Sequence, residues 1–64
     1  MDVMNIRRYL VYFDGDRRDY FGNVDWEDML VTLETNEELA GLFSMNEIEK
    51  LEKCFEDFVV EPVD

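Results

Sequence analysis

The sequence predicts an α+β domain in which an N-terminal β-hairpin packs against two main helices and a short connecting helix. Three observations lead to this fold class. A run of aromatic and β-branched residues ends at Asp14-Gly15, a dipeptide suited to a tight hairpin turn. Apolar residues recur at helical spacing in two later segments. Because 47% of the 64 residues are apolar, we expect one folded acidic domain spanning residues 1–64.

The predicted hairpin begins with a strand over residues 6–13, in which β-branched and aromatic side chains dominate. After the Asp14-Gly15 turn, the chain should return as a second strand over residues 18–21. Gly22-Asn23 should then form a turn or a β-bulge. Since the apolar residues of the first strand fall on both faces, we expect both faces of the hairpin to be partly covered.

The first helix is predicted to begin at Asp25, a residue type that favours the N-cap position. Apolar residues then follow at i, i+3, i+4 and i+7, which places them on one stripe facing the hairpin. They are Trp26, Met29, Leu30 and Leu33. A short connecting helix should follow over residues 37–43, weakened by Gly41.

The last helix has the clearest start in the chain. Ser44 and Glu47 stand in the spacing of a capping box, in which each side chain satisfies a backbone N–H of the other residue. The predicted helix continues to Phe58 and gathers an apolar arc of Ile48, Leu51, Cys54, Phe55, Phe58 and Val59. Residues 59–63 contain three β-branched valines together with Pro62, and they predict a short third edge strand.

These elements should share one core. Its expected members are the apolar residues that face inward in each predicted element: Leu10, Val11, Tyr20, Trp26, Leu30, Leu33, Leu39, Phe43, Ile48, Leu51, Phe55 and Phe58. Replacing one of the large aromatic members with alanine should cost about 3–5 kcal/mol.

The net charge of −11 is unevenly distributed. Residues 1–24 carry four arginines and four aspartates, whereas residues 25–64 carry thirteen acidic residues and two lysines. Such a field repels nucleic acids and anionic membranes and attracts basic proteins. The four arginines of the hairpin are expected to neutralise neighbouring carboxylates as exposed ion pairs, and not to bind nucleic acid.

Residues that could carry catalysis or bind a metal are scarce. The chain has no histidine, so the commonest general base and nitrogen ligand are absent. Ser44 is expected to cap a helix, and Cys54 to be a buried, inert thiol. Asp14, Asp16 and Asp19 do not follow the spacing of an EF-hand calcium loop. We therefore expect no enzyme activity, no metal site and no cofactor.

The carboxylates of the predicted helices are the best candidates for a binding site. Spaced at i+3 and i+4, they would repeat about every 4.5–6 Å, an approximate electrostatic imitation of DNA, which presents one phosphate per strand about every 3.4 Å of axis. The expected partner-binding residues are Glu27, Asp28, Glu34, Glu37, Glu38, Glu49, Glu52 and Glu56, with the last three forming a stripe on the final helix. An acidic surface that only keeps the protein in solution is the simpler interpretation, but −11 exceeds the charge of about 2–8 that this requires.

In size, charge and compactness the chain resembles small acidic inhibitors that phages and mobile elements direct against host nucleic-acid-binding proteins, such as DNA mimics and anti-CRISPR proteins. That resemblance implies an inhibitor that occupies the basic nucleic-acid-binding surface of a target protein. The alternative is an adaptor that docks or forms a homodimer through an apolar, aromatic surface. A single cysteine and the lack of a signal or membrane-spanning segment predict a cytoplasmic protein.

Overall fold

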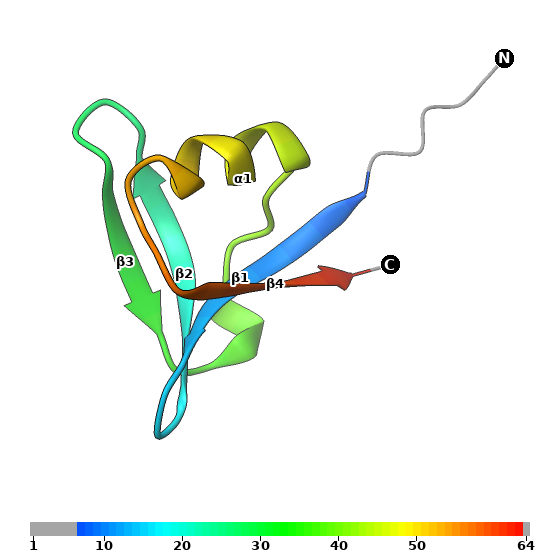
Figure 1. Ribbon diagram of the computed structural model, residues 1–64. Coiled ribbons are helices and arrows are strands. Elements are labelled where there is room, and N and C mark those ends of the chain that lie inside the picture. The colour runs from blue at the N-terminus through cyan, green and yellow to red at the C-terminus, as the bar shows by residue number, and fades with distance from the viewer. Residues whose placement is uncertain (1–6, 64) are drawn as a thin grey trace, which may run out of the picture.

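The computed structural model describes residues 7–63, which form a four-stranded antiparallel sheet, one α-helix and one short 3-10 helix (Figure 1). The elements in chain order are β1 (Arg8–Asp14), β2 (Arg18–Asp25), β3 (Leu30–Glu34), η1 (Glu37–Leu39), α1 (Met45–Glu52) and β4 (Phe58–Val63). The strands lie in the order β3-β2-β1-β4. The expected arrangement of a hairpin covered by two main helices is therefore wrong. Most of the described residues that form regular structure lie in the four strands, and α1 is the one α-helix among them.

The predicted hairpin is present, and its second strand is longer than expected. β1 and β2 pair in antiparallel register from Tyr12 opposite Tyr20 to Asp14 opposite Arg18. β2 then continues to Asp25, and its pairing with β3 shifts between Phe21 and Val24. That shift places a β-bulge at Gly22-Asn23, one of the two interpretations of this dipeptide. Ile6, the first residue of the predicted first strand, lies outside the described residues.

The segment predicted as the first helix forms a turn and a strand. Asp25 does cap its N-terminal end, since its carboxylate accepts hydrogen bonds from the backbone N–H groups of Glu27 and Asp28 at 3.1 and 3.3 Å. The turn is not continued, because Met29 adopts a left-handed backbone conformation with φ 54°. The chain therefore reverses into β3 instead of propagating a helix.

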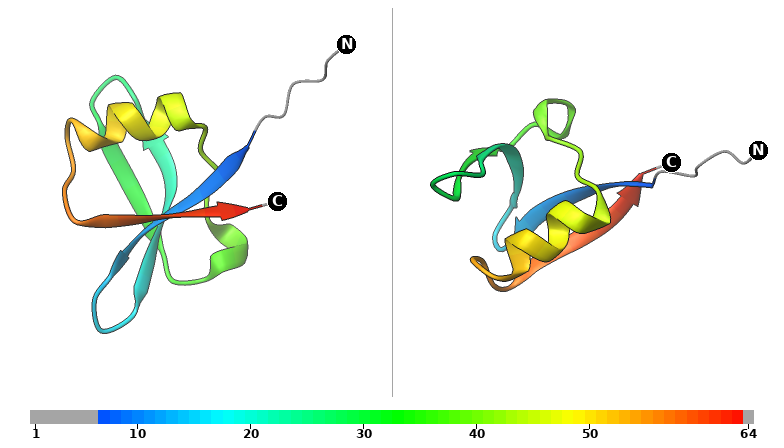
Figure 2. Two further views of the ribbon diagram at one scale, coloured as in Figure 1. Left: turned by 45° about the vertical axis from the view of Figure 1, so that its right-hand side comes forward. Right: turned by 90° about the horizontal axis from the view of Figure 1, so that it is seen from above.

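The connecting helix is reduced to η1, after which the chain is extended. The Gly41 N–H donates to the Phe21 carbonyl oxygen at 2.9 Å, and Phe43 exchanges two backbone hydrogen bonds of 2.9 Å with Tyr9. This strip is thus hydrogen-bonded to both the middle of β2 and the start of β1. Figure 2 shows it running from η1 to α1. A side chain at Gly41 would overlap the Gly22 carbonyl, so only glycine fits there.

The last helix starts where the sequence predicts and ends earlier. The capping box is formed: the Ser44 hydroxyl accepts from the Glu47 N–H at 3.2 Å, and the Glu47 carboxylate accepts from the Ser44 N–H at 2.9 Å. α1 ends at Glu52, and the chain turns through Asp57, whose φ is 63°. Cys54 is consequently exposed, which corrects its predicted burial on the helix. β4 pairs with β1 as the expected edge strand.

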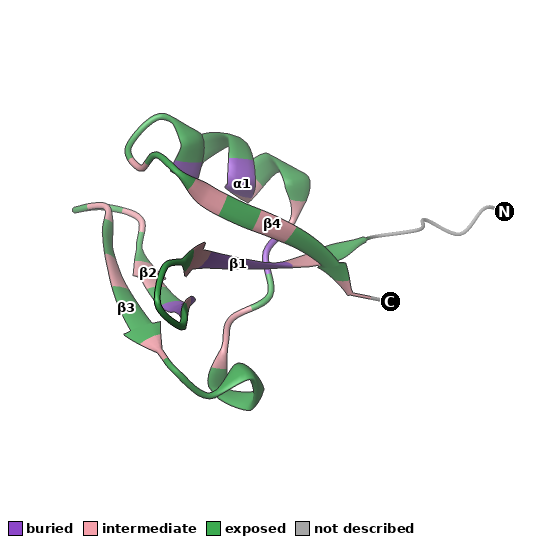
Figure 3. Ribbon diagram, turned by 60° about the horizontal axis from the view of Figure 1, so that its bottom comes forward, coloured by how far each residue is buried: buried purple, intermediate pink, exposed green. Residues whose placement is uncertain are grey.

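Buried side chains form two clusters, one on each face of the sheet. Figure 3 shows buried stretches of the ribbon on β1 and α1. The larger cluster lies on the face covered by α1 and contains Val11, Phe21, Phe43, Ile48 and Leu51. The smaller one, on the opposite face, contains Leu10, Tyr12 and Tyr20. Both faces of the hairpin are thus covered in part, as the mixed pattern of the first strand predicts.

Three predicted core residues are wrong because the elements that would have buried them did not form. Leu30, Leu33 and Leu39 are 63%, 48% and 62% exposed. Trp26, Phe55 and Phe58 are partly buried and pack against the larger cluster. The predicted core omits Phe21, which is fully buried with its ring centroid within 6 Å of those of Phe13, Phe55 and Phe58.

Candidate partner-binding surface

Five of the eight predicted binding carboxylates lie around one strand, β3. Glu27 and Asp28 occupy the turn that precedes it, Glu34 is its last residue, and Glu37 and Glu38 belong to η1. In Figure 1 the turn and η1 lie at opposite ends of β3. No lysine or arginine occurs between Asp19 and Glu49, so nothing in this part of the sequence offsets the charge. The strand is consequently flanked by negative charge at both ends.

The other three predicted carboxylates do not form the expected stripe. Glu49 and Glu52 are exposed on α1, but Glu56 lies in the loop after the helix has ended. The Glu47 carboxylate of the same helix is engaged in the capping box. Repetition of carboxylates along two helices, on which the likeness to DNA phosphate spacing depends, is therefore absent.

β3 lies at one edge of the sheet, and its side chains are less covered than those of the inner strands. Leu33 pairs in register with Phe21, and Glu34 pairs with Tyr20. Leu33 thus lies on the face that α1 covers, and Glu34 on the opposite face. This strand was not predicted, although the run Leu30-Val31-Thr32-Leu33 carries the signal of a β-rich segment.

The face of the sheet opposite α1 carries a cluster of tyrosines with one arginine. The rings of Tyr12 and Tyr20 have centroids 5.2 Å apart, and the Arg18 guanidinium lies 4.5 Å from the centre of the Tyr12 ring. Arg18 also lies 3.6 Å from the Glu61 carboxylate, which is one of the expected exposed ion pairs. Arg17 and Asp19 form a second pair at 3.2 Å.

These contacts shift two pKa values. Burial raises the pKa of Tyr12 above its ordinary value, and a hydrogen bond to Glu61 raises that pKa further. A hydrogen bond with Tyr20, together with the neighbouring Tyr12, raises the pKa of Arg18. Both groups therefore keep their protons at neutral pH, so the cluster acts as a structural contact between strands and supplies no general base.

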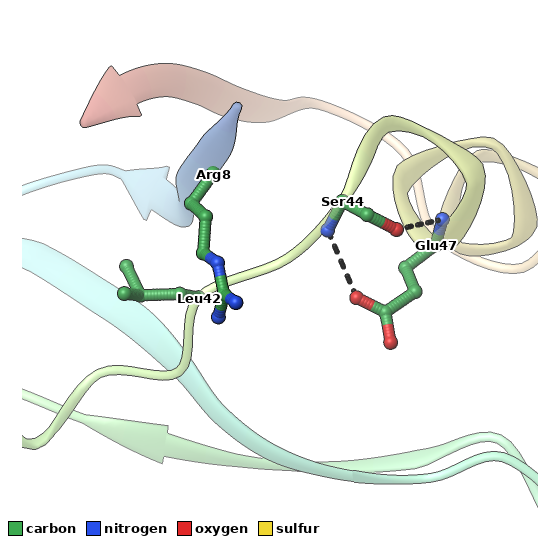
Figure 4. Close-up of a pocket in the computed structure, with 4 residues that line it drawn as sticks. All are labelled: Arg8, Leu42, Ser44 and Glu47. Carbon is green, nitrogen blue, oxygen red and sulfur yellow. Dashed lines mark hydrogen bonds between the residues drawn. The ribbon is translucent and has the colours of Figure 1, made fainter. Parts of the chain in front are cut away.

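A surface cavity of about 310 Å³ lies between the start of β1 and the start of α1 (Figure 4). Arg8, Leu42, Ser44 and Glu47 line it. The Ser44 hydroxyl and the Glu47 carboxylate already bind each other's backbone N–H groups, and Arg8 is the one cation among the four. Two of the three polar side chains that line the cavity are therefore already hydrogen-bonded in the capping box of α1.

Residues 7–63 contain neither a metal-binding cluster nor a membrane-spanning helix. No group of three or more His, Cys, Asp or Glu side chains is placed to hold a metal ion there. Nor does this part of the chain contain a helix with the length and apolar character needed to cross a membrane.

Comparison with known proteins gave no match to a family model, a curated protein or a solved structure. The predicted description as a phage inhibitor and DNA mimic was based on size and charge alone. That description is unsupported, since no relative carries it and residues 7–63 lack the helical carboxylate pattern.

Proposed function

We propose that this chain is a binding protein whose acidic β3 region takes up a basic surface of another protein. The observation that carries the proposal is the placement of Glu27, Asp28, Glu34, Glu37 and Glu38 around an edge strand with exposed leucines. Negative charge around an apolar strip attracts a partner that presents lysine or arginine beside apolar side chains. Proteins that bind nucleic acids carry such basic surfaces and are the partner class we propose.

A homodimer is the second candidate, and one observation favours it. Leu30, Leu33, Leu39 and Leu42 are each at least 45% exposed, which is unusual for leucines in so small a domain. Two copies would, however, bring together two surfaces that both carry an excess of carboxylates. A basic partner avoids that repulsion, so we prefer it to a second copy.

Two double variants with the same charge change test the proposal. Glu27→Lys with Glu37→Lys reverses one exposed charge at each end of β3, and Glu49→Lys with Glu52→Lys reverses two exposed charges on α1. Each raises the net charge from −11 to −7. A partner captured from extract at low salt and then purified should lose affinity for the β3 variant by at least about tenfold, because like charges in an interface cost several kcal/mol. The α1 variant should bind nearly as well as the parent chain.

Salt dependence separates the two candidates. Binding to a basic partner should weaken steeply as ionic strength rises, and added nucleic acid should compete for that partner. Sedimentation should show a monomer at all concentrations tested. Equal loss of affinity in both double variants, or binding that is insensitive to salt, would count against the proposed function.

A further inference from the structure

Within residues 7–63, the outer edge of β3 carries backbone groups that no other strand pairs with. The Phe21 carbonyl accepts its hydrogen bond from Gly41, which lies on the side of β2 away from β3. Phe21 and Leu33 are therefore a pair without mutual hydrogen bonds, and Leu33 directs its N–H and C=O away from β2. By the two-residue repeat of a strand, Val31 does the same. Among residues 7–63 no strand pairs with this edge.

The two edges of the sheet differ in how well they could accept another strand. β4, at the other edge, contains Pro62, which has no backbone N–H to donate, and its Glu61 is tied to Arg18. β3 contains neither proline nor lysine, the residues that commonly block an exposed edge. β3 is therefore the open edge of this sheet.

The side chains of β3 indicate the character of a strand placed beside it. On the face covered by α1, Val31 packs against the larger core cluster, and Leu33 next to it is 48% exposed. On the opposite face stands Glu34, with Glu37 and Glu38 just beyond it. A complementary strand would alternate apolar side chains on the first face with basic side chains on the second.

From these features we infer that the outer edge of β3 binds an extended segment of a basic protein as a fifth strand, with apolar and basic side chains alternating along it. This inference rests on the proposed function and names the mode of binding. Main-chain hydrogen bonds to Val31 and Leu33 provide the pairing, and the flanking carboxylates select for lysine and arginine. Pairing with the β3 edge of a second copy would place the same carboxylates beside one another, which disfavours that occupant.

The test uses a synthetic peptide of about seven residues that alternates lysine and valine, matched to the length of a typical strand. Its control has the same sequence and charge but carries an N-methyl group on every backbone amide, so that neither edge of the peptide can donate hydrogen bonds. Amide hydrogen exchange of the protein is followed by NMR with each peptide. The unmodified peptide should slow exchange of the Val31 and Leu33 amides at least about tenfold, and the methylated peptide should not.

A pair of variants at one position separates the backbone from the side chain. Leu33→Pro removes the outward N–H and the leucine side chain, whereas Leu33→Ala removes only the side chain. The proline variant should bind the lysine–valine peptide at least about tenfold more weakly than the alanine variant. Circular dichroism checks that both fold, and the exchange measurement on the parent chain decides the matter if the proline variant does not.

The outcomes separate this inference from the function on which it rests. Salt-sensitive binding of both peptides without protection at β3 would overturn strand addition and leave the proposed function standing. Protection of Val31 and Leu33 that grows with protein concentration in the absence of peptide would overturn it in favour of a second copy. Failure of both peptides to bind at low salt would count against strand addition and the proposed function together.

Discussion

At the scale of single residues, close backbone approach at Gly41 holds the strip after η1 against the sheet. A Cβ at Gly41 would overlap the Gly22 carbonyl, while a Cβ at Gly15, in the hairpin turn, would meet nothing within 4 Å. Gly41→Ala should therefore destabilise the fold by about 1–3 kcal/mol, because the strip must move away from β2. Gly15→Ala is the matched control and should change the free energy of unfolding by less than about 0.5 kcal/mol. Urea unfolding measures both variants. Equal losses of unfolding free energy in the two variants would show that Gly41 does not lie close against the Gly22 carbonyl.

Two single residues also explain why the helices predicted at residues 25–33 and 44–58 end early or do not form. Met29 and Asp57 take positive φ values of 54° and 63°. The left-handed backbone at Met29 ends the turn that follows Asp25, and the one at Asp57 lies directly before β4. Neither position is a glycine. Methionine is a good helix former, so Met29 carries no sign of a reversal, whereas aspartate is one of the residue types that adopt this conformation more readily. The local signals that were read correctly are those made by side chains alone, such as the Ser44–Glu47 capping box.

At the scale of elements, the strand β3 shows why helical spacing misled the prediction. Trp26, Met29, Leu30 and Leu33 match a helical stripe, but β2 extends to Asp25 and offers an unpaired edge on which residues 30–34 can form a ladder. Pairing with a neighbouring strand overrides local preference for short apolar segments. The five candidate carboxylates around β3 are exposed or half-exposed, but their gathering around one strand depends on that pairing and could not be foreseen.

The strands β1, β2 and β4 meet at the Tyr12 cluster, which makes their pairing sensitive to alkaline pH. Tyr12 is 5% exposed, and its pKa is raised above the ordinary value of 10.0 by burial first and by Glu61 second. Because the pKa of Tyr12 is higher in the folded state than in the unfolded state, the protonated Tyr12 hydroxyl contributes its full share of folding stability below about pH 10. This contribution is lost as pH rises through the folded pKa.

Tyr12→Phe should accordingly reduce the loss of stability above about pH 10. Glu61→Gln should reduce it only in part, because burial remains as the larger cause. Urea unfolding at a series of pH values from neutral to alkaline gives the comparison. A Tyr12→Phe profile that falls as steeply as that of the parent chain would assign the alkaline loss to other groups.

At the scale of the whole molecule, the net charge of −11 opposes folding while it favours a basic partner. The carboxylates around β3 lie close together only when the sheet is formed, so folding itself concentrates like charge. Among residues 7–63, two ion pairs offset part of this charge. Exposed pairs such as Arg17 with Asp19 typically contribute about 0–1 kcal/mol each. The surface that attracts a partner is therefore one that the free chain maintains at the expense of stability.

Added salt should consequently stabilise the free protein. Its Cα radius of gyration is 12.1 Å. At about 0.01 M ionic strength the screening length is about 30 Å, so every carboxylate repels the others across the fold. At about 0.15 M it is about 8 Å, and only near neighbours still interact. The thermal midpoint should rise by several degrees between these conditions, since about 1 kcal/mol shifts the midpoint of a domain this small by about 4–8 °C.

The variant with Glu49→Lys and Glu52→Lys is the control for this effect, because its net charge is −7 and both substitutions lie on exposed positions of α1. Its midpoint should depend less on salt than that of the parent chain. Repeating the scans at several protein concentrations excludes assembly as the cause, since stabilisation by a second copy would grow with concentration. A midpoint that falls as salt is added would mean that ion pairs such as Arg18 with Glu61 outweigh the repulsion. A basic partner neutralises the same carboxylates that salt screens, so the proposed binding and this salt effect should both be weakest in variants that reverse charge around β3.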